Sequence, residues 1–122
     1  MMWEGINKRR FPRVNYKCLI RISKDRQQEE VIDTYTENIG AGGICVTLDR
    51  GYDLFEKVSL EIHLGGDEPV HCSGAIVWVV KGHPVHKWEK PMYDTGIEFV
   101  DINENDRERI SRLVDELMKA EA

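Results

Sequence analysis

Hydrophobic and polar residues alternate along most of the chain with the period of two that is typical of half-buried β-strands. The alternation runs from Val14 to Ser23 and is followed by a β-branched and aromatic segment from Val31 to Glu37. Four later segments alternate in the same way, over residues 44–48, 58–64, 70–80 and 92–100. Clusters of glycine, proline and charged residues separate these segments, which favours turns between them. The pattern predicts six antiparallel strands.

The connections between the predicted strands differ in length. The polar residues from Lys24 to Glu30 predict a turn, and residues 81–91 predict a loop because they include Gly82, Pro84 and Pro91. Gly74 interrupts the long fifth segment and predicts a β-bulge or a sharp coil, of the kind that barrels need.

The period of the pattern changes after residue 101. Five apolar residues recur at helical spacing, with charges on the opposite side: Ile110, Leu113, Val114, Leu117 and Met118. Asn103, followed three residues later by Asp106, predicts a capped helix start. We expect a C-terminal helix that packs on the strands, and the alternative is a helix that pairs with another subunit. Strands followed by one helix, without βαβ alternation, predict an all-β barrel or sandwich plus helix.

The length of 122 residues predicts a single domain. We divide it into a basic N-terminal arm (1–13), a barrel (14–101) and a C-terminal helix (102–122). The sequence has neither the apolar run of about 18 residues that spans a bilayer nor the apolar segment of a signal peptide, so we expect a cytoplasmic protein without membrane insertion. Its three cysteines are scattered through predicted strands, which favours buried thiols in a reducing compartment over a metal or redox role.

Charge is distributed unevenly along the chain. The net charge is −5, yet residues 1–26 contain eight lysines and arginines against only Glu4 and Asp25. Such a basic segment attracts anionic ligands. The acidic total argues against general binding to DNA or RNA, whose affinity depends on many phosphate contacts.

Two short stretches carry the most distinctive chemistry. The first, residues 8–13, reads Lys-Arg-Arg-Phe-Pro-Arg, and Pro12 disfavours a helix there. Its guanidinium groups suit phosphate oxygens and the O6/N7 edge of a purine. The second stretch, residues 38–43, reads Asn-Ile-Gly-Ala-Gly-Gly, a glycine-rich turn in which Asn38 offers an amide to a base edge.

Together the two stretches resemble the PilZ family, whose signature is RxxxR followed by [D/N]xSxxG. Arg9 and Arg13 match the first motif, Asn38 and Gly43 match the second, and Gly40 stands where the second motif has serine. The segments Gly74-Ala75-Ile76-Val77-Trp78 and Gly96-Ile97-Glu98-Phe99 are similar to later strands of the family.

The resemblance implies a six-stranded antiparallel PilZ-like β-barrel of bacterial origin that binds the second messenger cyclic di-GMP. By resemblance, the ligand would contact Arg9, Arg13, Asn38, Gly40 and Gly43, with further charge from Lys8 and Arg10. The implied function is a receptor or adaptor that passes the messenger level to a partner protein in motility, attachment or polysaccharide export, as a monomer or homodimer. The alternative is a degenerate PilZ-like interaction module that does not bind the nucleotide.

Catalysis has little support in the sequence, and no cofactor or metal is expected. His63 and His71 are predicted to face one another across two strands, and His83 and His86 lie close together in the loop. Neither pair has the carboxylate or thiol pattern of a metal site or a catalytic triad. We therefore expect a binding protein rather than an enzyme.

Overall fold

A computed structural model describes residues 12–24, 27–66, 68–84 and 86–121, without the side chains of 27–29 and 121. It contains seven strands and a C-terminal helix within these residues. They are β1 (Arg13–Asn15), β2 (Leu19–Lys24), β3 (Gln27–Gly40), β4 (Gly43–Leu48), β5 (Lys57–His63), β6 (Val70–Lys81), β7 (Tyr93–Asp101) and α2 (Glu104–Glu121).

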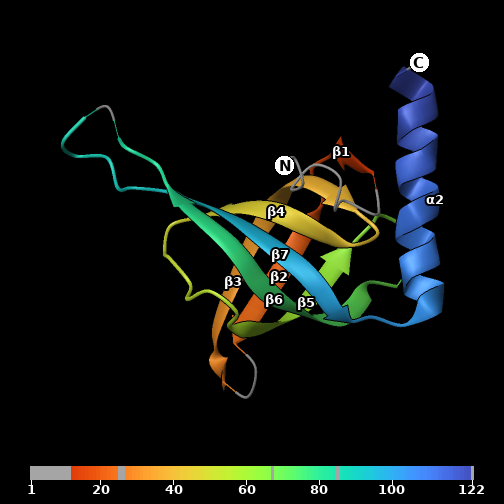
Figure 1. Cartoon of the computed structure of the whole chain (residues 1–122), viewed down its shortest axis with the longest axis horizontal. Coiled ribbons are helices and arrows are strands. Elements are labelled where there is room, and N and C mark those ends of the chain that lie inside the picture. The colour runs from red at the N-terminus through yellow and green to blue at the C-terminus, as the bar shows by residue number, and fades with distance from the viewer. Residues whose placement is uncertain (1–11, 25–26, 67, 85, 122) are drawn as a thin grey trace, which may run out of the picture.

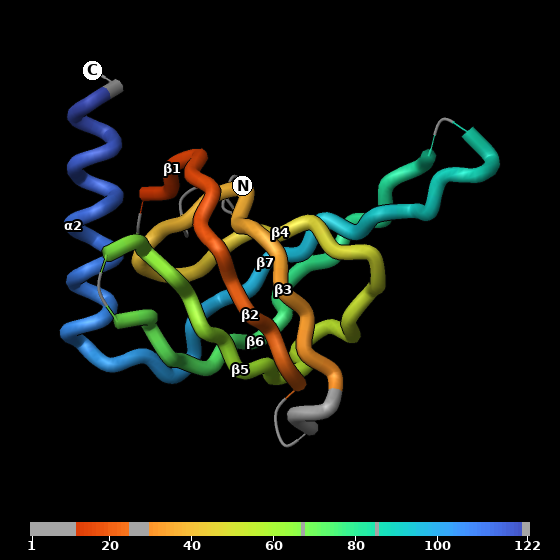
Figure 2. The backbone as a smooth tube through the Cα atoms, turned by 180° about the vertical axis from the view of Figure 1, so that it is seen from behind, coloured from red at the N-terminus to blue at the C-terminus, as the bar shows by residue number. Residues whose placement is uncertain are grey.

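Six of the strands form a closed antiparallel barrel. Their order is β3-β2-β5-β6-β7-β4, and pairing of β4 with β3 closes the ring. β1 is an extra strand that pairs with the end of β3, and α2 lies beside it (Figures 1 and 2). The predicted six-stranded antiparallel barrel with a C-terminal helix is confirmed.

The first predicted strand is in fact two strands, β1 and β2. They meet β3 in registers that differ by one residue, because Asn15 pairs with Asn38 whereas Leu19 pairs with Tyr35. Thr36, which is buried, holds the break: its hydroxyl accepts a hydrogen bond from the Cys18 backbone N (3.0 Å) and donates one to the Tyr16 backbone O (2.7 Å). The alternation did not reveal this break because the inward positions on both sides of it are even-numbered.

The turn predicted from Lys24 to Glu30 is longer than the turn in the structure. β3 already begins at Gln27, which pairs with Lys24. Polar side chains do not prevent a hairpin from extending, because its ladder is made of backbone hydrogen bonds. The predicted irregularity at Gly74 is confirmed, since the β6–β7 register shifts between Ser73 and Gly74.

The core fills the barrel with inward-facing side chains, and the helix covers part of it. Each of the six barrel strands contributes at least one fully buried isoleucine: Ile20, Ile22, Ile39, Ile44, Ile62, Ile76 and Ile97. The Asn103 side chain caps α2 by accepting a hydrogen bond from the Asp106 backbone N (3.0 Å), as predicted. From α2, Ile110 and Val114 join the same core, and the helix packs against β1 and β3. The helix described by the structure is not apolar enough over its length to cross a membrane.

We predict that Ile110→Ala lowers the free energy of unfolding by about 2–5 kcal/mol, because Ile110 is fully buried between helix and barrel. Thermal and denaturant unfolding measure the change. Met118→Ala on the same helix is the matched control, since Met118 is 44% exposed, and should cost about 1 kcal/mol or less. Equal effects of the two substitutions would contradict the packing of α2 on the core.

Candidate functional site

Strand pairing brings the two sequence motifs together on the outside of the barrel. Arg13 pairs with Gly40 between β1 and β3, and Gly40 pairs with Gly43 between β3 and β4. Val14 is buried, so its neighbour Arg13 points outward. The Arg13 Nη1 lies 3.4 Å from the Asn38 Oδ1, to which it donates. The structure thus juxtaposes residues 25 positions apart in the sequence. Lys8, Arg9 and Arg10, the other basic residues expected at this site, lie outside the described residues.

The glycine-rich turn is a tight hairpin, as predicted. Residues 41 and 42 connect Gly40 to Gly43. The two motif glycines are explained by crowding rather than by a left-handed backbone, because neither has a positive φ. A Cβ on Gly40 would lie 2.5 Å from the Pro12 carbonyl O, and a Cβ on Gly43 would overlap the Ile97 carbonyl O. Both glycines therefore allow neighbouring strands to approach closely.

A row of outward positions continues the site across four neighbouring strands. Asn38 pairs with Cys45, Cys45 with Gly96, and Gly96 with Trp78. The Trp78 indole lies over Gly96, where a Cβ would overlap it. We call the outer surface of Asn38, Cys45, Gly96 and Trp78 the shelf. Cys45 is buried and the Trp78 ring covers Gly96, so the shelf presents the Asn38 amide at one end and the aromatic ring at the other.

The sequence did not identify Trp78 and Gly96 as site residues. Both were matched only to later strands of the resembled family. Their position beside Asn38 follows from the register of β4, β7 and β6, which no short motif encodes. Strict alternation along β6 would place Trp78 on the same side as the buried Ile76, and the register shift between Ile76 and Trp78 is what turns Trp78 outward.

A cleft of about 690 Å³ adjoins the shelf on the side away from Arg13. Its volume is in the range of small-molecule sites. The lining residues come from β1, the segment after it, β3, β4 and β7: Asn15, Tyr16, Lys17, Glu37, Asn38, Cys45, Thr47 and Asp94. The Thr47 Oγ1 lies 3.1 Å from the Glu37 Oε1 and 2.9 Å from the Asp94 Oδ1. The cleft therefore combines two amides and the cation of Lys17 with two carboxylates. The sequence analysis had selected only Asn38 among these residues.

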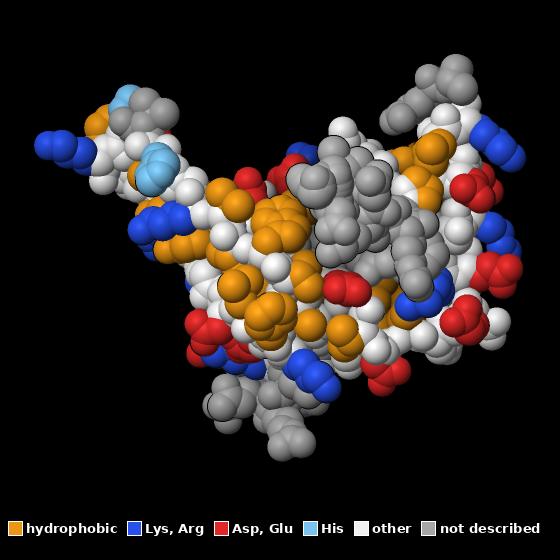
Figure 3. Space-filling model, in the orientation of Figure 1, with side chains coloured by type: hydrophobic (Ala, Val, Ile, Leu, Met, Phe, Trp, Pro, Cys, Tyr) orange, Lys and Arg blue, Asp and Glu red, His pale blue; other side chains and the backbone are white. Residues whose placement is uncertain are grey.

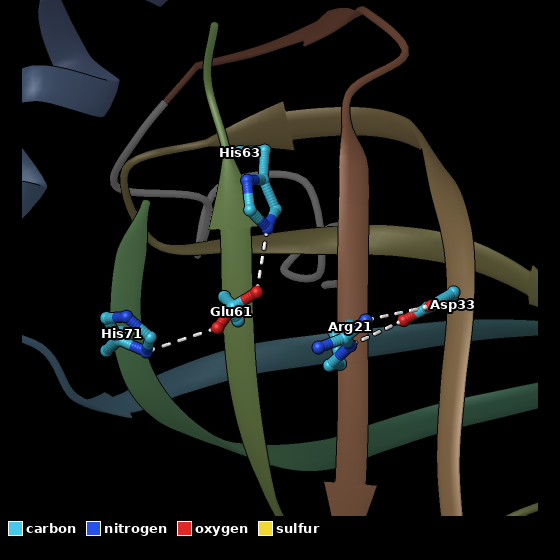
Figure 4. A network of polar contacts seen from close by, with 5 residues as sticks. All are labelled: Arg21, Asp33, Glu61, His63 and His71. Carbon is cyan, nitrogen blue, oxygen red and sulfur yellow. Dashed lines mark hydrogen bonds and ion pairs between the residues drawn. The ribbon is translucent and has the colours of Figure 1, made fainter. Parts of the chain in front are cut away.

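A separate polar cluster lies on the outer face of β3, β2, β5 and β6 (Figure 4). The Glu61 carboxylate lies between two histidines, 2.8 Å from the His63 Nε2 and 3.8 Å from the His71 Nδ1. The expectation that His63 and His71 face one another was wrong, because His71 pairs with Glu61 across β5 and β6 and the two histidines meet only through this carboxylate. Beside it, Arg21 donates to both carboxylate oxygens of Asp33 (2.8 and 3.2 Å), and this hydrogen bonding lowers the pKa of Asp33. Because these groups are solvent-exposed, their pairing adds little stability.

The described cysteines and acidic residues offer little for metal or thiol chemistry. Burial raises the pKa of the Cys18 thiol and raises that of Cys72 to about 12, so both are protonated at neutral pH. Among the described residues, no group of three or more His, Cys, Asp or Glu side chains is arranged to hold a metal ion.

Comparison with known proteins identifies relatives of this fold. A family model described as the PilZ domain matches residues 7–116. A search of the curated proteins found no match.

Three solved structures illustrate the likeness. The chain is 20% identical to Bacillus subtilis Inhibitor of motility (MotI/DgrA), with a TM-score of 0.76 over 94% of this chain and 53% of that chain. It is 10% identical to the PilZ domain with c-di-GMP of YcgR from Escherichia coli, with a TM-score of 0.70 over 93% of both chains. It is 15% identical to the K. pneumonia MrkH–c-di-GMP complex, with a TM-score of 0.73 over 93% of this chain and 53% of that chain.

These structures share the fold, and this chain spans about half the length of the MotI and MrkH chains. The family itself follows from the match of the family model, which covers most of the sequence. The protein belongs to the PilZ domain family.

Proposed function

We propose that this protein is a receptor for cyclic di-GMP that binds the messenger on the shelf and reports its level to a partner protein. The observation that carries the proposal is the meeting of Arg13 and Asn38 on one outer surface, in register with Gly40 and Gly43. The structural relatives YcgR and MrkH are described with c-di-GMP, which supports the same ligand class here.

Each part of the surface suits one part of the ligand. The guanidinium of Arg13 presents planar donors for a phosphate or for the O6/N7 edge of guanine. Asn38 offers an amide to a base edge, and the exposed part of the Trp78 indole offers a π-face for stacking. Arg9, with Lys8 and Arg10, would add the cations of the RxxxR motif. The basic N-terminal segment would steer the dianionic ligand toward this face of an otherwise acidic protein.

Binding on the outside of the barrel explains how such a receptor acts without catalysis. The ligand changes the charge and shape of a surface made from β1, β3, β4 and β7, and a partner protein reads that change. Motility, attachment and polysaccharide export are the processes that we propose for the partner. The barrel itself supplies a rigid support for this surface.

The second candidate function is an interaction module that does not bind the nucleotide. Gly40 favours this function, because the motif position lacks its serine hydroxyl. The carboxylates of Glu37 and Asp94 in the cleft also favour it, because they repel phosphate. Calorimetry with cyclic di-GMP, and with GTP and cyclic GMP as controls, separates the two. Saturable binding of cyclic di-GMP supports the receptor, whereas no binding by the folded protein leaves the interaction module.

We predict that Arg13→Ala weakens cyclic di-GMP binding at least about tenfold, because a charge-assisted hydrogen bond contributes about 1.5–3 kcal/mol. Arg21→Ala is the matched control, since it removes the same charge from the face occupied by Glu61 and the histidines (Figure 4). Titration calorimetry measures both variants, and melting temperatures verify their folding. An Arg13→Ala variant that binds as tightly as Arg21→Ala would contradict the assignment of Arg13.

We also predict that Gly40→Ser does not tighten binding, although serine is the motif residue. A hydroxyl would add a hydrogen bond only if the backbone accepted the side chain, but the serine Cβ would meet the Pro12 carbonyl O at 2.5 Å. β1 must then shift away from β3, which lowers the melting temperature and displaces Arg13. Affinity and melting temperature measured together verify this. Tighter binding at an unchanged melting temperature would show that β1 can shift away from β3 without loss of stability, and would contradict this prediction.

A further inference from the structure

Exposed hydrophobic side chains gather on the outer face of β6 and β7, beside the turn that precedes β5 (Figures 1 and 3). The exposed fraction is 57% for Val80 on β6 and 50% for Val100 on β7. In the turn before β5, Leu54 is 56% exposed and Phe55 is 76% exposed. Val77 on β6 is partly exposed. We call the surface of these five residues the apolar patch.

Backbone contacts bring the members of the apolar patch together. The Phe55 backbone N donates a hydrogen bond to the Ile76 backbone O (2.7 Å), so the turn lies against β6 next to Val77. On its other side, β6 pairs with β7. Phe55 and Val100 therefore lie on opposite sides of β6, which makes the patch about two strand spacings, or about 10 Å, wide. This is the diameter of one α-helix.

Three members of the patch sit at backbone irregularities. The register between β6 and β7 shifts twice, and Val77 and Val100 are the extra residues at the two bulges. A bulge re-aims a side chain, and such bulges are common next to functional sites. Among the residues that the structure describes, Phe55 is the one non-glycine residue with a positive φ (67°). A bulky residue adopts this conformation only at a cost in energy, whereas glycine adopts it freely.

The fold itself does not explain a phenylalanine at position 55. Its side chain lies outside the hydrophobic core, and its backbone conformation suits glycine better. Single exposed hydrophobic residues are common on protein surfaces, but a group of them with a strained aromatic residue is typical of an interaction site. Phe55 therefore indicates a contact with a molecule outside this chain.

Exposed carboxylates border the apolar patch. They come from the turn before β5 and from β7: Asp53, Asp94, Glu98 and Asp101. The exposed cations near the patch are Lys57 and Lys81, at the start of β5 and the end of β6. This border disfavours a second copy of the chain, which would bring the same negative charges, and it attracts a cationic partner.

We infer that the apolar patch is a docking surface for a basic amphipathic helix of a partner protein. Its width fits one helix, and its length along β6 from Gly74 to Val80, about 20 Å, matches about 13 helical residues. The apolar face of such a helix covers the patch, and its lysines or arginines meet the bordering carboxylates. The chain's own α2 packs elsewhere, against β1 and β3. This inference goes beyond the proposed function, because none of the five patch residues belongs to the shelf.

The test measures binding of a labelled 14-residue peptide of leucine and lysine by fluorescence anisotropy. Its leucines recur at i, i+3, i+4 and i+7, which gives a helix with one apolar face and lysines beside it. One control peptide has the same composition in scrambled order, and the other has glutamate in place of lysine. The full-length protein, without any nucleotide, should bind the first peptide at least about tenfold more tightly than either control.

Phe55→Gly separates docking from a structural role. It should weaken binding of the basic amphipathic peptide at least about tenfold, which is the usual loss when an aromatic anchor is removed from an interface. Its melting temperature should stay unchanged or rise, because glycine accepts the positive φ without strain. A lower melting temperature would show that Phe55 packs within the chain, and would overturn its assignment to the docking surface.

Val100→Ser and Val31→Ser form a matched pair, because these valines are 50% and 47% exposed. Val31 lies on β3 and lines a different groove, with Glu61. Val100→Ser should weaken peptide binding several-fold and Val31→Ser should not change it. Glu98→Lys should also weaken binding, because it reverses a charge at the border of the patch.

Two results would overturn the inference. One is a folded parent that does not prefer the basic amphipathic peptide, or that binds it no more tightly than its Phe55→Gly and Val100→Ser variants do. The other is self-association of the parent in analytical ultracentrifugation that Phe55→Gly abolishes, since this would assign the patch to a second copy of the chain. Neither result depends on whether the protein binds cyclic di-GMP.

Discussion

The structure depends on how one long strand, β3, pairs with three neighbours. Its first part pairs with β2, and its last residues pair with both β1 and β4. The change happens at Thr36 and Glu37. There the buried Thr36 hydroxyl bonds the backbone at Tyr16 and Cys18, in addition to the backbone hydrogen bonds from Thr36 N to Cys18 O (3.0 Å) and from Tyr16 N to Glu37 O (3.3 Å). A buried hydroxyl must be hydrogen-bonded, so these two contacts hold β3 at the point where the barrel closes.

The same irregularity builds the site. Because Glu37 is an extra residue on β3, it points toward Thr47 while Asn38 stays outward beside Cys45. β1 continues this outer surface with Arg13 and Asn15. On the other side of the barrel axis, the surface of β2, β5 and β6 holds the Glu61 cluster (Figure 4). Figure 3 shows hydrophobic side chains gathered over β6 and β7, with acidic and basic side chains at their edges.

Alternation and turn residues were sufficient to predict the barrel strands, the helix and its Asn103 cap. These features are local, because a period of two or 3.6 is set by the chain itself. The split between β1 and β2 was missed because the inward side chains Val14 and Ile20 keep the same parity across it. The early start of β3 was missed because backbone pairing in a hairpin needs no apolar side chains.

Only those site residues that belong to a short sequence motif could be predicted. Arg13, Asn38, Gly40 and Gly43 were selected by motif, and the structure brings them together. Trp78, Thr47 and Asp94 were not selected because their places depend on the register of β4, β6 and β7. Glu61 was missed for a similar reason: its contact with His71 crosses from β5 to β6. Long-range register is a property of the closed barrel, and a single sequence does not display it.

The departure from the motif at Gly40 has a structural cause, and this affects how the two candidate functions compare. If the motif serine had been replaced by glycine without any structural reason, a serine side chain would still fit at position 40. Here β1 lies so close to β3 that any Cβ at position 40 meets the Pro12 carbonyl O. Glycine at this position is what allows Arg13 to approach Asn38. The missing hydroxyl is therefore a consequence of how the arginine is placed, and it is weak evidence for a degenerate module. The stronger test of degeneracy is the charge balance of the cleft, where Glu37 and Asp94 oppose an anionic ligand and Lys17 attracts it.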